Sequence, residues 1–172
     1  MLQRTRAKQV QPVYEEFRER FPSPEAFLQA TPEERQQVFE RLGLAWRSER
    51  LEKAAHYLHE HEPAYNVDEL KEVPGVGHYA AAAVASFYGD TRAALIDNNI
   101  ARFAARICGQ DYGPETRRAS WLKSFVDAMT PSEDVRTFNY GLLDVSRTIC
   151  VRTPLCDRCP VSMVCCYRRS RG

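Results

Sequence analysis

The chain has 172 residues, of which 44% are hydrophobic, and its formal net charge is +1. This apolar content excludes a disordered chain, and the length suits one compact unit or two small lobes. The near-neutral charge does not by itself indicate a nucleic-acid partner. No signal peptide, membrane-spanning run or repeat stands out, which predicts a soluble cytoplasmic protein with no membrane partner.

Apolar residues at helical spacing predict helices in the N-terminal part of the chain. The positions are Val10, Val13, Tyr14, Phe17 and Phe21 in the first segment, and Leu51, Ala54, Ala55 and Leu58 in a later one. Pro12 is expected to set the start of the first helix or to kink it. Between the two segments, Thr31-Pro32-Glu33-Glu34 is a capping box that opens a helix expected to run to Gly43.

A glycine turn, Pro74-Gly75-Val76-Gly77, separates two further predicted helices. Asn66 caps the helix that enters the turn, and an alanine-rich run over residues 80–85 forms the one that leaves it. Glycines allow positive φ and leave N–H groups uncovered at the second helix start, which suits an anion. Small residues also suit a helix that packs very close to its neighbours. The pattern predicts a helix-hairpin-helix, although a glycine-terminated helix followed by another helix is the alternative.

Asp97 lies immediately before an amphipathic run that contains Ile100, Phe103 and Ile107. An aspartate in this position is a natural helix N-cap. The other interpretation is a catalytic carboxylate held at the N-terminus of a helix. Position alone leaves both interpretations open.

Two more helices are predicted after residue 120. Their apolar positions are Trp121, Leu122, Phe125, Val126 and Met129, and then Phe138, Leu142, Val145 and Ile149. The alternation typical of strands is absent throughout. The predicted fold class is therefore all-α.

The cysteines form a second strong pattern near the end of the chain. Cys150, Cys156, Cys159 and Cys165 are spaced C-x5-C-x2-C-x5-C, with Cys166 adjacent and Cys108 far upstream. Thiols this close together indicate a metal site or disulfides, and an intracellular protein argues against disulfides. Four cysteines suit zinc or an iron–sulfur cluster, and spacing alone does not decide between them.

The segments VPGVGHYAAAAV and LIDNNIARFAAR together resemble the helix-hairpin-helix (HhH-GPD) DNA glycosylases of the endonuclease III superfamily. The resemblance extends from MLQRT at the start to the final cysteines. It implies an endonuclease III-like helical fold, with a glycosylase region over 1–149 whose six-helix barrel core spans about 20–128. A 4Fe-4S cluster loop over 150–166 and a basic tail over 167–172 follow, while the family's first helix is missing.

The resemblance also implies roles for individual residues. Asp97 matches the family's catalytic carboxylate, which stabilises a cationic sugar or positions water on it. Asn99 matches a nearby family asparagine, and Tyr79 occupies the place of the lysine nucleophile of bifunctional members. The implied DNA-binding residues are Arg4, Gln3, Gly75, Val76, Gly77 and His78. Arg4 matches the side chain that family members push into the gap left by the flipped base.

For the cysteines, the resemblance implies a 4Fe-4S cluster. The implied ligands are Cys150, Cys156, Cys159 and Cys165. The family's loop is C-x6-C-x2-C-x5-C, so the first gap here is one residue short, and Cys166 is an alternative to Cys165. The cluster is expected to be structural and to hold a basic loop against DNA, because residues 147–172 carry six arginines and one acid.

Two subfamilies are nearest, the thymine/uracil mismatch glycosylases and the MutY-type adenine glycosylases. Adenine must be protonated to leave, and the glutamate that does this precedes the point that matches Met1. Adenine enzymes also carry a further C-terminal domain, beyond the point that matches Gly172, and usually have glutamine in place of Arg4. These features favour the thymine/uracil group. A chain truncated at its start would also lack this glutamate.

The expected function is base-excision repair by a monofunctional glycosylase that hydrolyses the N-glycosidic bond of thymine or uracil opposite guanine. The expected partner is double-stranded DNA with a mismatched or damaged base, bound by a monomer in the nucleoid. Adenine excision opposite 8-oxoguanine is one alternative. A catalytically silent DNA-binding module is another alternative. Asp97 argues against it, because a protein that only binds DNA needs no carboxylate facing phosphate.

Overall fold

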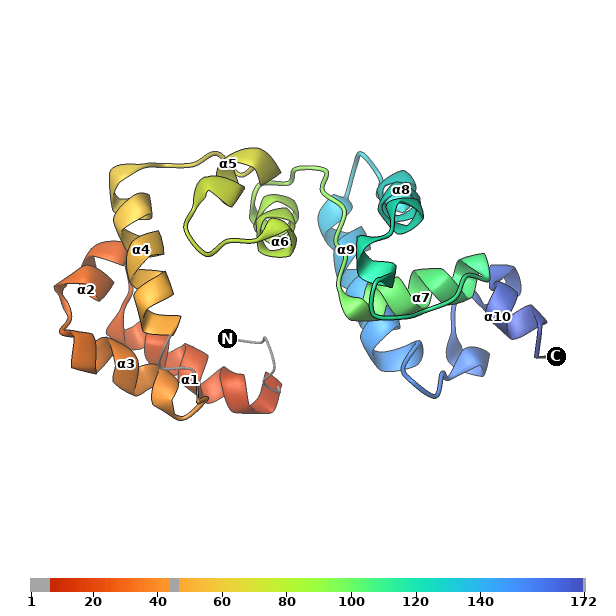
Figure 1. Ribbon diagram of the computed structural model, residues 1–172, viewed down its shortest axis with the longest axis horizontal. Coiled ribbons are helices and arrows are strands. Elements are labelled where there is room, and N and C mark those ends of the chain that lie inside the picture. The colour runs from red at the N-terminus through yellow and green to blue at the C-terminus, as the bar shows by residue number, and fades with distance from the viewer. Residues whose placement is uncertain (1–6, 44–46, 172) are drawn as a thin grey trace. The chain divides into compact units, whose positions relative to one another are not determined.

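The computed structural model describes residues 7–43 and 47–171, and all regular structure in these ranges is helical (Figure 1). This confirms the all-α prediction. The chain forms two compact units, one of residues up to 64 together with 71–76, and the other of 65–70 together with 77 onward. Gln3 and Arg4 lie outside the described residues. No helix in the described ranges is long and apolar enough to cross a bilayer.

Four helices of the first unit lie in the described residues before residue 61. They are α1 (Ala7–Arg20), α2 (Pro24–Gln29), α3 (Pro32–Glu40) and α4 (Arg47–Glu60). The capping box of α3 forms as predicted: Glu34 N–H donates to Thr31 Oγ1 at 3.2 Å, and Thr31 N–H donates to the Glu34 carboxylate at 2.8 Å. The helix ends at Glu40, earlier than predicted, because the chain turns up to Gly43, which has φ +63°. Pro12 lies inside α1 and does not mark its start.

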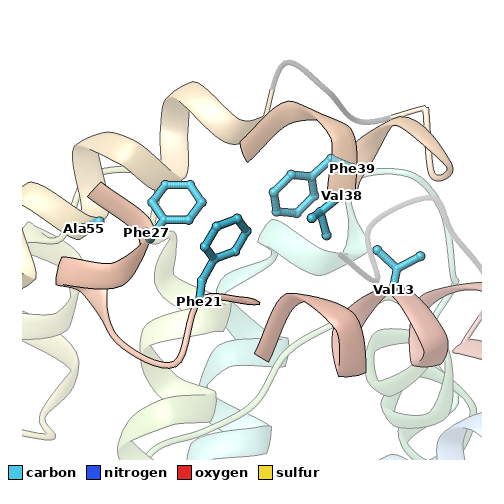
Figure 2. Packing of buried hydrophobic residues seen from close by; sticks show 6 residues of the cluster. All are labelled: Val13, Phe21, Phe27, Val38, Phe39 and Ala55. Atoms are coloured by element: carbon cyan, nitrogen blue, oxygen red, sulfur yellow. The ribbon is translucent and has the colours of Figure 1, made fainter. Parts of the chain in front are cut away.

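Aromatic side chains form the core of the first unit, where α1, α2, α3 and α4 contribute buried residues (Figure 2). Phe21 and Phe27 meet edge to face with ring centroids 5.1 Å apart, an arrangement favoured by the ring quadrupoles. The buried Arg35 guanidinium lies over the Phe27 ring and pairs with Glu52 at 2.7 Å. The end of α5 (Val67–Glu72) and the turn that follows it belong to the same unit.

The second unit is built around α7. Its elements after α5 are α6 (His78–Tyr88), α7 (Asn98–Cys108), η1 (Thr116–Arg118), α8 (Ser120–Met129), α9 (Val135–Asp144), the π-helical turn η2 (Val145–Ile149), η3 (Cys156–Arg158), η4 (Ser162–Val164) and α10 (Cys166–Arg169). Helix α7 contacts α8, α9, η2 and α10, and Ile100 and Ala104 on its inner face are fully buried. The apolar stripe predicted after Asp97 is thus the centre of this unit.

Helix α6 packs against α9, and the rings of Phe87 and Tyr140 stack between the two helices with centroids 4.4 Å apart. Ala81, Ala82 and Ala85 are buried, so the prediction of a closely packed alanine helix is confirmed. The last predicted helix is interrupted after Asp144, where η2 widens the helix by one residue and Cys150 N–H donates to Val145 O at 2.7 Å. Such π turns re-aim the side chains that follow them.

Candidate active site

Asp97 caps the N-terminus of α7, as its position in the sequence predicted. Its backbone is extended, and its Oδ1 accepts from the backbone N–H groups of Asn99 and Ile100, both at 2.8 Å. The side chain is only 18% exposed. These two bonds and the helix dipole hold a carboxylate charge in a fixed orientation and leave Oδ2 for other partners.

Two side chains donate to Asp97 Oδ2. Asn99 Nδ2 lies 3.1 Å away, and Arg147 Nη2 forms an ion pair at 3.1 Å. The same Arg147 nitrogen lies 3.4 Å from the Tyr79 hydroxyl. The structure therefore brings together the three predicted residues Asp97, Asn99 and Tyr79, and adds Arg147.

Sequence reasoning missed Arg147. In the chain it is an arginine on a predicted helix, which is ordinarily a solvated surface residue. It lies in η2, the π turn that follows the regular helix α9, and turns of this kind often occur at functional sites. A widened turn has no reliable signature in local sequence.

Tyr79 sits at the start of α6 with its ring partly buried. Burial raises the pKa of the Tyr79 phenol, while the neighbouring Arg147 charge opposes that rise. The phenol is therefore protonated at neutral pH and is not a nucleophile. It also lacks the amine needed to form an imine with a sugar aldehyde.

Two arginines of α7 connect the Asp97 site to the cysteine segment. Arg102 donates to Asn99 Oδ1 at 3.2 Å, to Ser146 O at 2.9 Å and to Cys150 O at 2.9 Å. The first of these bonds orients the Asn99 amide so that its nitrogen faces Asp97. One helical turn later, Arg106 donates to Val151 O at 2.6 Å and approaches the Cys150 sulfur at 3.3 Å.

Removing Arg102 is expected to destabilise the second unit. In Arg102→Met, two partly buried carbonyls and the Asn99 oxygen lose a charged donor, so the free energy of unfolding should fall by about 3 kcal/mol. Urea unfolding measures this change. Arg118→Met is the matched control, because Arg118 makes an exposed ion pair with Glu115 and its loss should change stability by about 0.5 kcal/mol or less. Equal effects of the two variants would contradict the assigned role of Arg102.

The glycine turn has different geometry at its two glycines. In the first unit, Val76 N–H donates to Val73 O at 3.0 Å and Gly75 has φ +82°, the pattern of a type II turn with Pro74 in its second position. Gly77 has φ −88°, so the expectation of positive φ there is wrong. It is the N-cap of α6 and has no side chain to bond the first N–H groups of that helix.

Because Gly77 has no side chain, it leaves the N-terminus of α6 uncovered. A Cβ built on it would meet nothing within 4 Å, and His78 beside it is exposed. The first turn of α6 presents N–H groups on an accessible surface of the second unit, where an anion is favoured by these donors and by the helix dipole.

Four cysteines line a common cavity between α7 and the C-terminal segment. They are Cys150, Cys156, Cys159 and Cys165. Cys166 lies elsewhere, against Gly109, where a built Cβ would be 3.1 Å from Cys166 Cβ. The geometry thus separates the two adjacent cysteines and places Cys165 with the other three.

Four cysteines around one cavity are a donor set of the kind that holds zinc or an iron–sulfur cluster. Within the described ranges, no three acidic, histidine or cysteine side chains are gathered as ligands of one metal ion.

The chain is similar in sequence to two kinds of DNA glycosylase. The chain is 33% identical to a thymine-DNA glycosylase of Aeropyrum pernix, over 97% of this chain and 78% of the relative. It is 31% identical to an adenine DNA glycosylase of Mycolicibacterium smegmatis, over 100% of this chain and 59% of the relative.

Solved structures share the fold. A thermostable thymine-DNA glycosylase, 29% identical, superimposes with a TM-score of 0.89 over 98% of this chain and 80% of its own. An endonuclease III in a non-covalent DNA complex, 22% identical, superimposes with a TM-score of 0.76 over 94% and 77% of the two chains. The endonuclease III-like fold expected from the sequence is confirmed. A family model described as HhH-GPD superfamily base excision DNA repair protein matches residues 1–124. The chain belongs to the HhH-GPD superfamily of base excision DNA repair proteins.

Proposed function

We propose that the protein is a monofunctional DNA glycosylase that removes thymine or uracil opposite guanine from duplex DNA. The observation that carries this proposal is the Asp97 carboxylate, fixed by two backbone N–H donors and by Asn99, with Arg147 and Tyr79 beside it. Relatives named thymine- and thymine/uracil-DNA glycosylases align along nearly the whole chain.

The proposed reaction is hydrolysis at the anomeric carbon of a flipped nucleotide. As the bond from sugar to base breaks, positive charge develops on the sugar, and the oriented Asp97 carboxylate stabilises it. Asn99, itself held by Arg102, keeps Asp97 Oδ2 in place, so little reorganisation is needed when the charge appears. Water adds to the anomeric carbon because Tyr79 offers no amine to compete with it.

The same proposal assigns DNA backbone binding to two features. In the second unit, the uncapped N-terminus of α6 with Gly77 and His78 is suited to a phosphate. In the first unit, the turn that holds Gly75 and Val76 exposes backbone to a ligand because Gly75 has no side chain. Gln3 and Arg4 remain assigned to DNA by the sequence alone.

A 4Fe-4S cluster on the cysteine cavity is also part of the proposal. Cys150, Cys156, Cys159 and Cys165 would hold it. When bound, the cluster supplies a cross-link between the end of η2 and the C-terminal segment. Burial raises the pKa of the Cys150 thiol, and the Arg106 charge beside its sulfur opposes that rise, in the direction of the thiolate form that metal binding requires.

Base excision from defined duplexes tests the proposed function. Duplexes with G·T, G·U and adenine opposite 8-oxoguanine are incubated with the protein and analysed with and without alkali. We expect loss of thymine and uracil opposite guanine, with strand breaks only after alkali. Exclusive removal of adenine would replace this proposal with the MutY-type activity, and binding without any excision would indicate a silent DNA-binding module.

Tyr79→Lys is expected to introduce lyase activity. A lysine at the start of α6, near Asp97 and Arg147, would place an amine close to the anomeric carbon, where it can form an imine with the abasic sugar. The measurement is borohydride trapping of a covalent protein–DNA complex and strand nicking without alkali.

The control variant for this gain of function is Tyr88→Lys. Tyr88 ends the same helix and is 72% exposed, so its replacement adds the same charge to α6. Only Tyr79→Lys should give a trapped complex. Efficient trapping by the unmodified protein would overturn the monofunctional assignment.

A further inference from the structure

Arg147 creates an electrostatic problem for a carboxylate that must stabilise a cation. Its guanidinium lies 3.1 Å from Asp97 Oδ2, so the pair has no net charge. A neutral pair stabilises an isolated sugar cation less well than a lone carboxylate does, because the Arg147 charge repels that cation. The arrangement becomes favourable when negative charge also develops nearby during the reaction.

A departing pyrimidine supplies this negative charge. When the bond from C1′ to N1 breaks, its electron pair stays on the base, which spreads the charge to its carbonyl oxygens. Water adds to C1′, and the proton that water loses finally joins the base. The transition state therefore has a positive sugar next to a negative base, and two opposite protein charges match it. A base that leaves only after protonation develops no such negative charge.

The geometry lets Arg147 reach such a base. Its side chain is 44% exposed, so a bound nucleotide can contact it, whereas Asp97 beside it is 18% exposed. The guanidinium has five N–H donors, and the contacts to Asp97 Oδ2 and Tyr79 use one of its terminal nitrogens. The other nitrogens of Arg147 therefore retain donors for a second, anionic partner.

We propose that Arg147 is a catalytic residue that stabilises the anionic pyrimidine as it leaves, and that the Arg147–Asp97 pair selects bases that depart as anions. This inference rests on the proposed function and deepens it. It assigns pyrimidine preference to a residue of η2, within the second unit.

Leaving-group dependence tests this role. Single-turnover excision rates are measured for uracil, 5-fluorouracil and thymine opposite guanine, with the unmodified protein and with Arg147→Met. Fluorine withdraws electrons and stabilises the base anion, so 5-fluorouracil depends less on the protein. We expect Arg147→Met to slow uracil and thymine removal about 10²-fold, and 5-fluorouracil removal at least several-fold less than that. Arg147→Lys should recover part of the loss, because it retains the charge.

Arg136→Met is the matched control. Arg136 is an exposed arginine of α9, so its replacement removes the same charge and should leave all three rates unchanged. An equal loss for all three bases in Arg147→Met would overturn the proposal and indicate a phosphate contact or a structural ion pair. Unchanged rates would also overturn it. If the unmodified protein removes only adenine, the proposed function itself fails, which this design distinguishes from the failure of Arg147 alone.

Discussion

Asp97→Asn is expected to lower the excision rate by roughly 10²- to 10³-fold, the scale of losing a preorganised electrostatic group. The amide oxygen can still accept from the Asn99 and Ile100 N–H groups, so α7 should keep its cap. The variant loses the negative charge that faces the developing sugar cation, and with it the bonds that Oδ2 accepts from Asn99 and Arg147. The free energy of unfolding should therefore fall by about 2 kcal/mol or less. Single-turnover kinetics on G·U duplexes and urea unfolding together separate these two effects.

Binding provides the internal check for this variant. A carboxylate near phosphates repels them in the ground state, so Asp97→Asn should bind mismatched duplex as tightly as the unmodified protein or slightly more tightly. Asp134→Asn is the control, because Asp134 precedes α9 and its side chain makes no cap hydrogen bond. A folded Asp97→Asn variant that excises at a near-native rate would reduce Asp97 to a helix cap.

The parts of the site that were predictable depend on local sequence. Asp97 could be placed because an N-cap is specified by the residues directly after it, and the capping box of α3 followed from Thr31 and Glu34 in the same way. Packing of the α6 alanines was predictable because side-chain size limits how closely helices approach. Resemblance, and not local pattern, assigned chemistry to Asn99 and Tyr79.

The parts that were not predictable depend on contacts between distant residues. Arg147 meets Asp97 across fifty positions of sequence, and it does so from within the widened turn η2. The apolar spacing continues without a break from Phe138 to Ile149, so it predicted one regular helix. The structure instead has an α-helix, α9, followed by the π-helical turn η2. The positive φ expected at Gly77 was wrong, because an N-cap glycine uses extended backbone. The turn itself needs positive φ only at Gly75.

The choice between Cys165 and Cys166 was also open in the sequence, because adjacent residues satisfy almost the same spacing. The fold separates them at the start of α10: Cys165 lines the cavity with three other cysteines, while Cys166 packs against Gly109 on α7's C-terminal end. A backbone that continues into a helix turns successive side chains in different directions. Only one of the two thiols can therefore face the proposed cluster.

Cys165→Ser is therefore expected to lose most of the iron, while Cys166→Ser retains about four irons per chain and the broad visible absorbance of a 4Fe-4S protein. Both substitutions exchange one sulfur for oxygen at neighbouring positions, so each serves as the control for the other. Because ligand binding and folding of such loops are coupled, Cys165→Ser should also unfold at a temperature lower by several degrees or more. Metal analysis after anaerobic purification and thermal unfolding measure the two effects. Loss of iron in Cys166→Ser alone would reverse the ligand assignment, and stoichiometric zinc with no iron in the unmodified protein would refute the cluster.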